Sequence, residues 1–275
     1  MPETDRYPDI LGLLDLERIG EDVFSAPASS DRPGPLLGSP VASQSLRAAS
    51  LTVPPDRTPH SLHAYFLRSG RGDGPVRLEV ERTRDGRSFA TRRVMASQEG
   101  SPVFTLAASF HTAQPGDDWQ ISKPVDVPGP EEMAGSEALV SRSGVVGAFD
   151  VLPAVVEAGR PSLVHPYWAR LRQRIPDDPV LHACVLTFVT DVGVNASARV
   201  PGASLRERLA GVSLDHAVWF HRPARVDDWL LFSVEAVTNS GSRGLATGGV
   251  YTREGVLVAS IAQEVLLRTP PPRPS

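Results

Sequence analysis

Residues 215–265 read DHAVWFHRPARVDDWLLFSVEAVTNSGSRGLATGGVYTREGVLVASIAQEV, and residues 61–110 read SLHAYFLRSGRGDGPVRLEVERTRDGRSFATRRVMASQEGSPVFTLAASF. The two stretches lie about 154 residues apart and place their apolar runs and turns in the same order. The matching residues include Phe66 with Phe220, Arg68 with Arg222 and, after one added residue, Gly100 with Gly255. A period of this length indicates a duplicated unit. The alternative is a chance similarity between two strand-rich segments.

Each copy has the pattern of antiparallel strands. Apolar and charged residues alternate over 76–81, which predicts a half-buried strand, and the Asp-Gly pair at 85–86 predicts a hairpin turn. Residues 89–98 and 102–110 predict two further strands. In the second copy, residues 256–261 are apolar on both faces, so we expect this strand in the interior of the sheet.

A helix is predicted before each copy. Residues 40–49 are weakly apolar on one face, and residues 180–189 carry apolar side chains at the spacing of an amphipathic helix. Asp177 and Asp178 precede the second helix and supply N-terminal capping chemistry. The repeated unit is therefore a helix followed by an antiparallel meander, and the predicted fold class is α+β.

Composition excludes several function classes. The chain has 275 residues and a formal net charge of −4, without the strongly basic surface that a nucleic-acid partner requires. No stretch of about 18 apolar residues is present, so no membrane span is predicted. Cys184 is the only cysteine, which excludes a disulfide framework and a site of several thiolates. We expect a cytoplasmic protein.

Three polar residues in apolar surroundings are the chemical candidates. Asp191 ends an apolar helix, where the helix dipole disfavours a carboxylate. Gln263 interrupts the apolar run IAQEVLL, and Ser213 stands two residues before Asp215. The simpler interpretations are a loop cap for Asp191, an edge-strand position for Gln263 and a turn for Ser213.

Other motifs carry little weight. The chain has no HExxH, Walker or GxSxG motif, and its seven histidines show no metal-ligand spacing. His63, His216 and His221 are interpreted as packing or hydrogen-bonded residues. The glycosylation sequon at Asn195 is interpreted as a chance match.

Two blocks of sequence are similar to a known family. The block DGRSFATRRV at 85–94 resembles the N-terminal half of the bacterial acyl-CoA thioesterase II family, and DHAVWFHRP at 215–223 with the Gln-Glu pair at 263–264 resembles its C-terminal half. The resemblance extends over about residues 14–268. It implies a double hotdog, in which two fused repeats each wrap a curved antiparallel sheet around a long helix.

The resemblance also implies an activity and its residues. Members hydrolyse acyl-CoA to a free fatty acid and CoA, without a metal or other cofactor, on water held by an Asp, a Thr or Ser, and a Gln. Asp191, Ser213 and Gln263 occupy those positions, with Ser213 in place of the commoner threonine. The expected partner is acyl-CoA, and the expected assembly is a homo-oligomer, either a dimer or a tetramer.

One departure from the family pattern concerns the first helix. The usual Gly-Gly-Gln stretch appears here as Gly38-Ser39-Pro40, in a helix that we assign to the non-catalytic half. The alternative function is a non-hydrolytic acyl-thioester binding protein or a specialised acyl-processing protein of a biosynthetic pathway. The predicted domains are an N-terminal hotdog (1–113), a linker (114–144), a C-terminal hotdog (145–268) and a disordered tail (269–275).

Overall fold

The computed structural model describes residues 9–30, 32–133, 145–154, 156–157, 160–161, 164–200, 202–204, 207 and 211–268. The helices are α1 (Ile10–Leu13), α2 (Gly38–Ser50), α3 (Pro179–Thr190) and α4 (Val194–Ser197). The strands are β1 (Glu17–Gly20), β2 (Val23–Ala26), β3 (Arg57–Phe66), β4 (Val76–Asp85), β5 (Phe89–Gln98), β6 (Ser101–Thr112), β7 (Phe149–Pro153), β8 (Val156–Glu157), β9 (Arg160–Pro161), β10 (Tyr167–Leu171), β11 (Gly211–Ser213), β12 (Asp215–Phe220), β13 (Leu230–Ser240), β14 (Arg243–Tyr251) and β15 (Leu257–Leu267).

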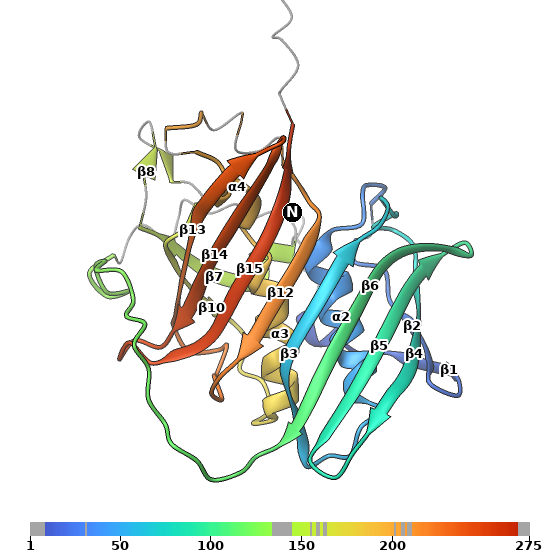
Figure 1. Cartoon of the computed structure of the whole chain (residues 1–275). Helices are drawn as coiled ribbons and strands as arrows, with labels where there is room; N and C mark the ends of the chain where they lie inside the picture. Colours follow the sequence, from blue (N-terminus) through green and yellow to red (C-terminus); the bar gives the residue numbers. More distant parts are fainter. Residues whose placement is uncertain are drawn as a thin grey trace, which may run out of the picture.

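Thirteen of the described strands form one sheet that curves around α2 and α3 (Figure 1). The strand order is β1-β2-β4-β5-β6-β3-β12-β15-β14-β13-β10-β7, with β11 beside β15. The first six strands belong to the N-terminal repeat and the rest to the C-terminal repeat. The repeats meet where β3 pairs antiparallel with β12, from Tyr65 opposite Asp215 to Ser61 opposite Trp219. This pairing makes one continuous sheet from two copies of the unit.

The predicted elements are confirmed with one refinement. A helix precedes each meander, and the apolar strand β15 lies in the sheet interior between β12 and β14. The pattern of α3 predicts a single buried stripe, but residues 184–190 are all buried. The reason is that α2 packs against α3 and covers a side that the sheet alone would leave exposed. Ser43 of α2 donates a hydrogen bond to the Cys184 carbonyl oxygen of α3 at 2.7 Å.

The domain boundaries at residues 113, 144 and 268 stay predictions. The predicted tail at 269–275, and residues 134–144 of the predicted linker, lie outside the described residues. In the described part of the chain, no helix is long and apolar enough to cross a membrane.

Two buried histidines predict a loss of stability in mild acid. Burial lowers the pKa of His165 to about 3, and burial also lowers the pKa of His216. At His165, between about pH 3 and the ordinary pKa of about 6.5, the unfolded chain binds a proton that the folded chain does not. The stabilisation from His165 is therefore fully present above about pH 6.5 and is lost as the pH falls, by up to about 1.4 kcal/mol per pH unit. The lowered pKa of His216 adds a loss of the same sign.

Urea unfolding at several pH values between 7 and 4.5 measures this effect. The free energy of unfolding should fall steadily over that range. Carboxyl groups with lowered pKa values, such as that of Asp22 beside Arg82, add to the loss only in stronger acid. A free energy of unfolding that stays constant between pH 7 and 4.5 would contradict the prediction.

Candidate active site

Asp191 is the first residue after α3, and its two carboxylate oxygens have different surroundings. Oδ2 accepts a hydrogen bond from the Ser39 hydroxyl at 2.8 Å. Oδ1 is buried and has no hydrogen-bond partner among the residues that the structure describes. A buried carboxylate oxygen without a donor is costly, and such a group in a folded protein is a candidate for a role in chemistry. The helix does end before Asp191, as the simpler interpretation held, but the side chain is directed to a second helix rather than capping the loop.

The contact with Ser39 brings α2, which we assign to the non-catalytic half, to the candidate residue Asp191. Ser39 lies in the first turn of α2, which belongs to the N-terminal repeat. Its hydroxyl reaches the Asp191 carboxylate from across the junction between the repeats. The departure at Gly38-Ser39-Pro40 therefore lies beside the candidate site. The two helices run in opposite directions, so the start of α2 meets the end of α3 (Figure 1).

Ser213 and Gln263 are brought into direct contact. Gln263 is fully buried on the interior strand β15, which excludes the edge-strand interpretation. Its Nε2 donates to Ser213 Oγ at 2.9 Å, and Ser213 Oγ donates to Asn195 Oδ1 at 3.2 Å. Ser213 is the last residue of β11, a strand that pairs with β15, so it is not a turn residue. The pairing of these two strands is what joins residues 50 positions apart.

His216 connects this pair to the end of α3. Its Nδ1 lies 2.6 Å from Gln263 Oε1, and its Nε2 lies 2.9 Å from the hydroxyl of Thr190, the residue before Asp191. The expected hydrogen-bonding role of His216 is confirmed. In the described part of the chain, no hydrogen bond joins Asp191 directly to Ser213 or Gln263. The three predicted residues therefore lie at one end of α3, with Asp191 linked to the others through its neighbour Thr190.

Tyr167 holds the turn that follows Asp191. The Tyr167 hydroxyl donates to the Val192 carbonyl oxygen at 2.9 Å. Burial, together with the nearby Asp191 carboxylate, raises the pKa of Tyr167, so the phenol stays protonated and able to donate. Gly193 then adopts a φ of 79°, a left-handed conformation that suits glycine. This turn leads into α4, which places Asn195 within hydrogen-bonding distance of Ser213.

Sequence reasoning missed Ser39, Thr190 and Asn195. Ser39 appeared only as a departure from a family pattern, and Asn195 only as part of a chance sequon. Neither carries a local signal, because each meets its partner through contacts between distant segments. Thr190 lies beside Asp191, but nothing in the sequence indicates that it faces a histidine 26 residues later.

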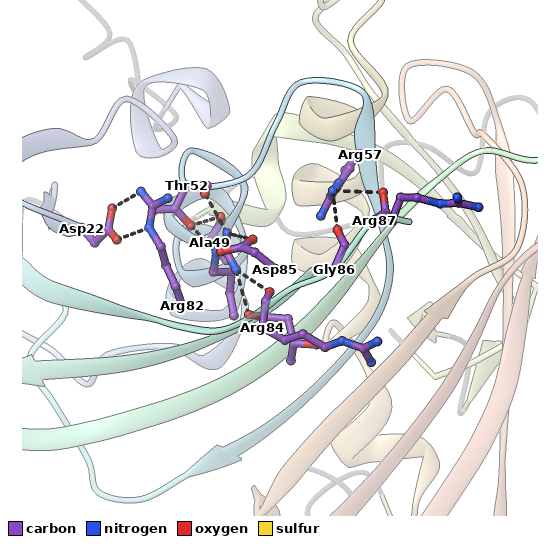
Figure 2. Close-up of polar contacts among 11 residues, drawn as sticks. Asp22, Ala49, Thr52, Arg57, Arg82, Arg84, Asp85, Gly86 and Arg87 are labelled. Carbon is purple, nitrogen blue, oxygen red and sulfur yellow. Dashed lines mark hydrogen bonds and ion pairs between the residues drawn. The ribbon is translucent and has the colours of Figure 1, made fainter. Parts of the chain in front are cut away.

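The equivalent end of the N-terminal repeat lacks these groups. With the one-residue offset of the repeat, Ala108 of β6 occupies the position of Gln263. Opposite Ala108, Arg92 of β5 is fully buried. Its guanidinium donates to Thr52 Oγ1 at 2.8 Å, just beyond the end of α2. Figure 2 shows Thr52 among the polar contacts of this region. In the N-terminal repeat, a buried structural cation thus lies opposite the position that corresponds to Gln263.

Gly38 is expected to tolerate no side chain. A Cβ at this position would lie 2.6 Å from Phe66 Cε1 and 2.8 Å from Asp191 Oδ2. Gly38→Ala should therefore displace the Asp191 carboxylate and lower turnover by about 10- to 100-fold, since a displacement of about 1 Å has effects of that order. Steady-state kinetics on purified protein measures it. Gly34→Ala is the matched control, because an added Cβ there meets nothing within 4 Å, and equal turnover of the two variants would refute the prediction.

Comparison with known proteins gives consistent matches. A family model described as acyl-CoA thioesterase matches residues 156–266, and one described as acyl-CoA thioesterase N-terminal domain matches residues 27–111. Human acyl-coenzyme A thioesterase 8 is 35% identical, over 94% of this chain and 88% of that protein.

Solved structures agree with these matches. The crystal structure of acyl-CoA thioesterase II TesB2 from Mycobacterium marinum is 38% identical, with a TM-score of 0.79 over 95% of this chain and 99% of that one. A hot dog fold protein from Alicyclobacillus acidocaldarius, 19% identical, has a TM-score of 0.73 over 95% of this chain and 98% of that one. The double hotdog expected from the sequence is confirmed.

Proposed function

The chain belongs to the acyl-CoA thioesterase family, and we propose that it hydrolyses fatty acyl-CoA with Asp191, Ser213 and Gln263 as the residues that hold the attacking water. The observation that carries the assignment of residues is the contact between the buried Gln263 amide and the Ser213 hydroxyl, at the end of the helix where Asp191 keeps one oxygen unpartnered. A buried amide, a hydroxyl and a carboxylate together can orient and deprotonate water.

The proposed reaction assigns one step to each group. Asp191 Oδ1 removes a proton from water while the water oxygen bonds to the thioester carbonyl carbon. Ser213 Oγ accepts the second hydrogen of the water, and Gln263 holds Ser213 by donating to it. Ser39 keeps the other carboxylate oxygen in place.

Collapse of the tetrahedral intermediate completes the reaction. The C–S bond breaks, the fatty acid leaves with the new oxygen, and the proton on Asp191 passes to the CoA thiolate. A thiol has a pKa of about 8.5, so the thiolate leaves without a dedicated general acid. This chemistry calls for no metal or other cofactor, and we propose that none is used.

Thiol release from a series of acyl-CoA thioesters, from acetyl-CoA to stearoyl-CoA, tests the activity. We expect turnover to peak within the series, because the depth of the acyl site limits the chain that fits. Calorimetric titration with the same thioesters runs alongside. Binding without thiol release would refute hydrolysis and favour the non-hydrolytic acyl-thioester binding protein. The assembly as a dimer or tetramer and the cytoplasmic location stay predictions.

A further inference from the structure

We propose that His216 is a positioning residue that sets the orientation of the Gln263 side-chain amide and does so as the neutral Nδ1–H tautomer. The proposal rests on the proposed function, because it explains how Gln263 comes to face Ser213. In the proposed reaction, His216 does not contact a reacting atom. Its role is to decide which end of the amide, the oxygen or the nitrogen, points to the site.

The first support is the position of the ring between two polar partners. His216 is fully buried on β12, with Gln263 Oε1 at 2.6 Å from Nδ1 and Thr190 Oγ1 at 2.9 Å from Nε2. An amide oxygen can only accept, so Nδ1 must carry the proton that bonds it. In the neutral ring Nε2 then accepts from the Thr190 hydroxyl, so in the proposed tautomer this hydroxyl donates to the ring and not to the Thr187 carbonyl oxygen, which also lies 2.9 Å from Thr190 Oγ1.

The second support is the set of hydrogen bonds that the amide nitrogen of Gln263 donates. Gln263 Nε2 has two hydrogens and two acceptors, Ser213 Oγ at 2.9 Å and Asn195 Oδ1 at 3.4 Å. If the amide were reversed, Gln263 Oε1 would face the oxygen of Asn195. The Nδ1–H tautomer therefore agrees with a chain of donors that runs from Thr190 through His216 and Gln263 to Ser213 and ends on Asn195.

The third support is the balance of charge around the ring. Two carboxylates, Asp191 and Asp215, act on His216 and favour its protonation, as does the bond to Gln263, but burial outweighs them and lowers the pKa of His216. Asp215 is itself engaged, because its Oδ1 accepts from the Glu264 backbone N–H at 2.6 Å. The neutral ring is thus compatible with its surroundings.

The direct test is nitrogen-15 NMR of the protein labelled at histidine, at neutral pH. The His216 resonances are assigned by their absence from the His216→Asn variant. We expect a protonated Nδ1 and an unprotonated Nε2. A ring protonated at Nε2, or at both nitrogens, would overturn the proposal, and this readout needs no substrate.

The kinetic test compares two replacements that differ in their ability to donate. His216→Asn places an amide N–H near the former Nδ1, whereas His216→Leu removes both ring nitrogens at similar volume. We expect His216→Leu to lower kcat about 100-fold with KM unchanged, since misplacement of a catalytic group has effects of that order, and His216→Asn to recover most of that loss. Equal losses in both, or no loss in His216→Leu, would contradict the role.

A control separates positioning from packing. His182 is also buried, with its Nδ1 accepting from the Val226 backbone N–H at 3.2 Å, at the other end of α3. His182→Leu should lower the melting temperature and leave kcat unchanged. If His216→Leu does not fold, the NMR result on the wild type still decides. Failure of the proposed function would appear separately, as absence of thiol release by the wild type or as full activity of Gln263→Ala.

Discussion

Asp191→Asn should lower kcat about 1,000-fold, the middle of the range for loss of a general base. Asparagine keeps the shape of the side chain, and its oxygen can still accept from Ser39 Oγ. It cannot take a proton from water. The loss should therefore appear in kcat, measured by thiol release, with little change in KM.

The same variant should be at least as stable as the wild type. Asp191 lies at the C-terminal end of α3, where a negative charge is unfavourable by about 0.5 kcal/mol. Removing the charge relieves that cost, so activity and stability should change in opposite directions. Asp177→Asn, at the other end of the same helix and with a side chain that is 90% exposed, is the matched control and should keep full activity. An Asp191→Asn variant with wild-type kcat would exclude Asp191 as the base.

Arg92→Met should destabilise the protein by about 3 kcal/mol. Arg92 is fully buried and donates to five acceptors, which are Thr52 Oγ1, the carbonyl oxygens of Thr52, Arg84 and Thr91, and Asp85 Oδ1. Figure 2 shows Thr52, Arg84 and Asp85 around this contact. Methionine fills similar space but leaves buried acceptors without donors, at about 1–3 kcal/mol for each group. Denaturant unfolding measures the change.

The neighbouring arginine is the control for this prediction. Arg93 alternates to the outer face of β5 and is exposed. Arg93→Met should change the free energy of unfolding by less than about 0.5 kcal/mol, as is usual at the surface. Because Arg92 lies at the end of the N-terminal repeat that lacks Gln263, its replacement should leave kcat at the wild-type value at temperatures where the protein stays folded. Similar stability losses in both variants would contradict the assigned role of Arg92.

Local patterns predicted the elements well because each depends on near neighbours. The alternation over 76–81 is visible in β4, and the Asp-Gly pair leads into the turn before β5. The burial of α3 on all sides was not predictable from its own sequence, since it depends on α2, about 140 residues earlier in the chain. The periodicity of a helix indicates which face packs on the sheet. It does not indicate that a second helix covers another face.

The site illustrates a different limit. Asp191, Ser213 and Gln263 stand out as polar residues in apolar runs. The resemblance to a family then implies that the three act together. Ser39 could not be found in that way, because its contact with Asp191 spans 152 residues. The contact arises only when the start of one helix meets the end of the other, which is a property of the packed repeats.

The most direct test of a single site served by Asp191 and Gln263 together is the kcat of Asp191→Asn, Gln263→Ala and the double variant. Groups that act together on one water give losses that do not multiply. We expect about 1,000-fold for Asp191→Asn, about 100-fold for Gln263→Ala, and a double variant no worse than Asp191→Asn. A double variant whose loss is the product of the two single losses would show that Asp191 and Gln263 act independently, and wild-type turnover in either single variant would exclude that residue from the site.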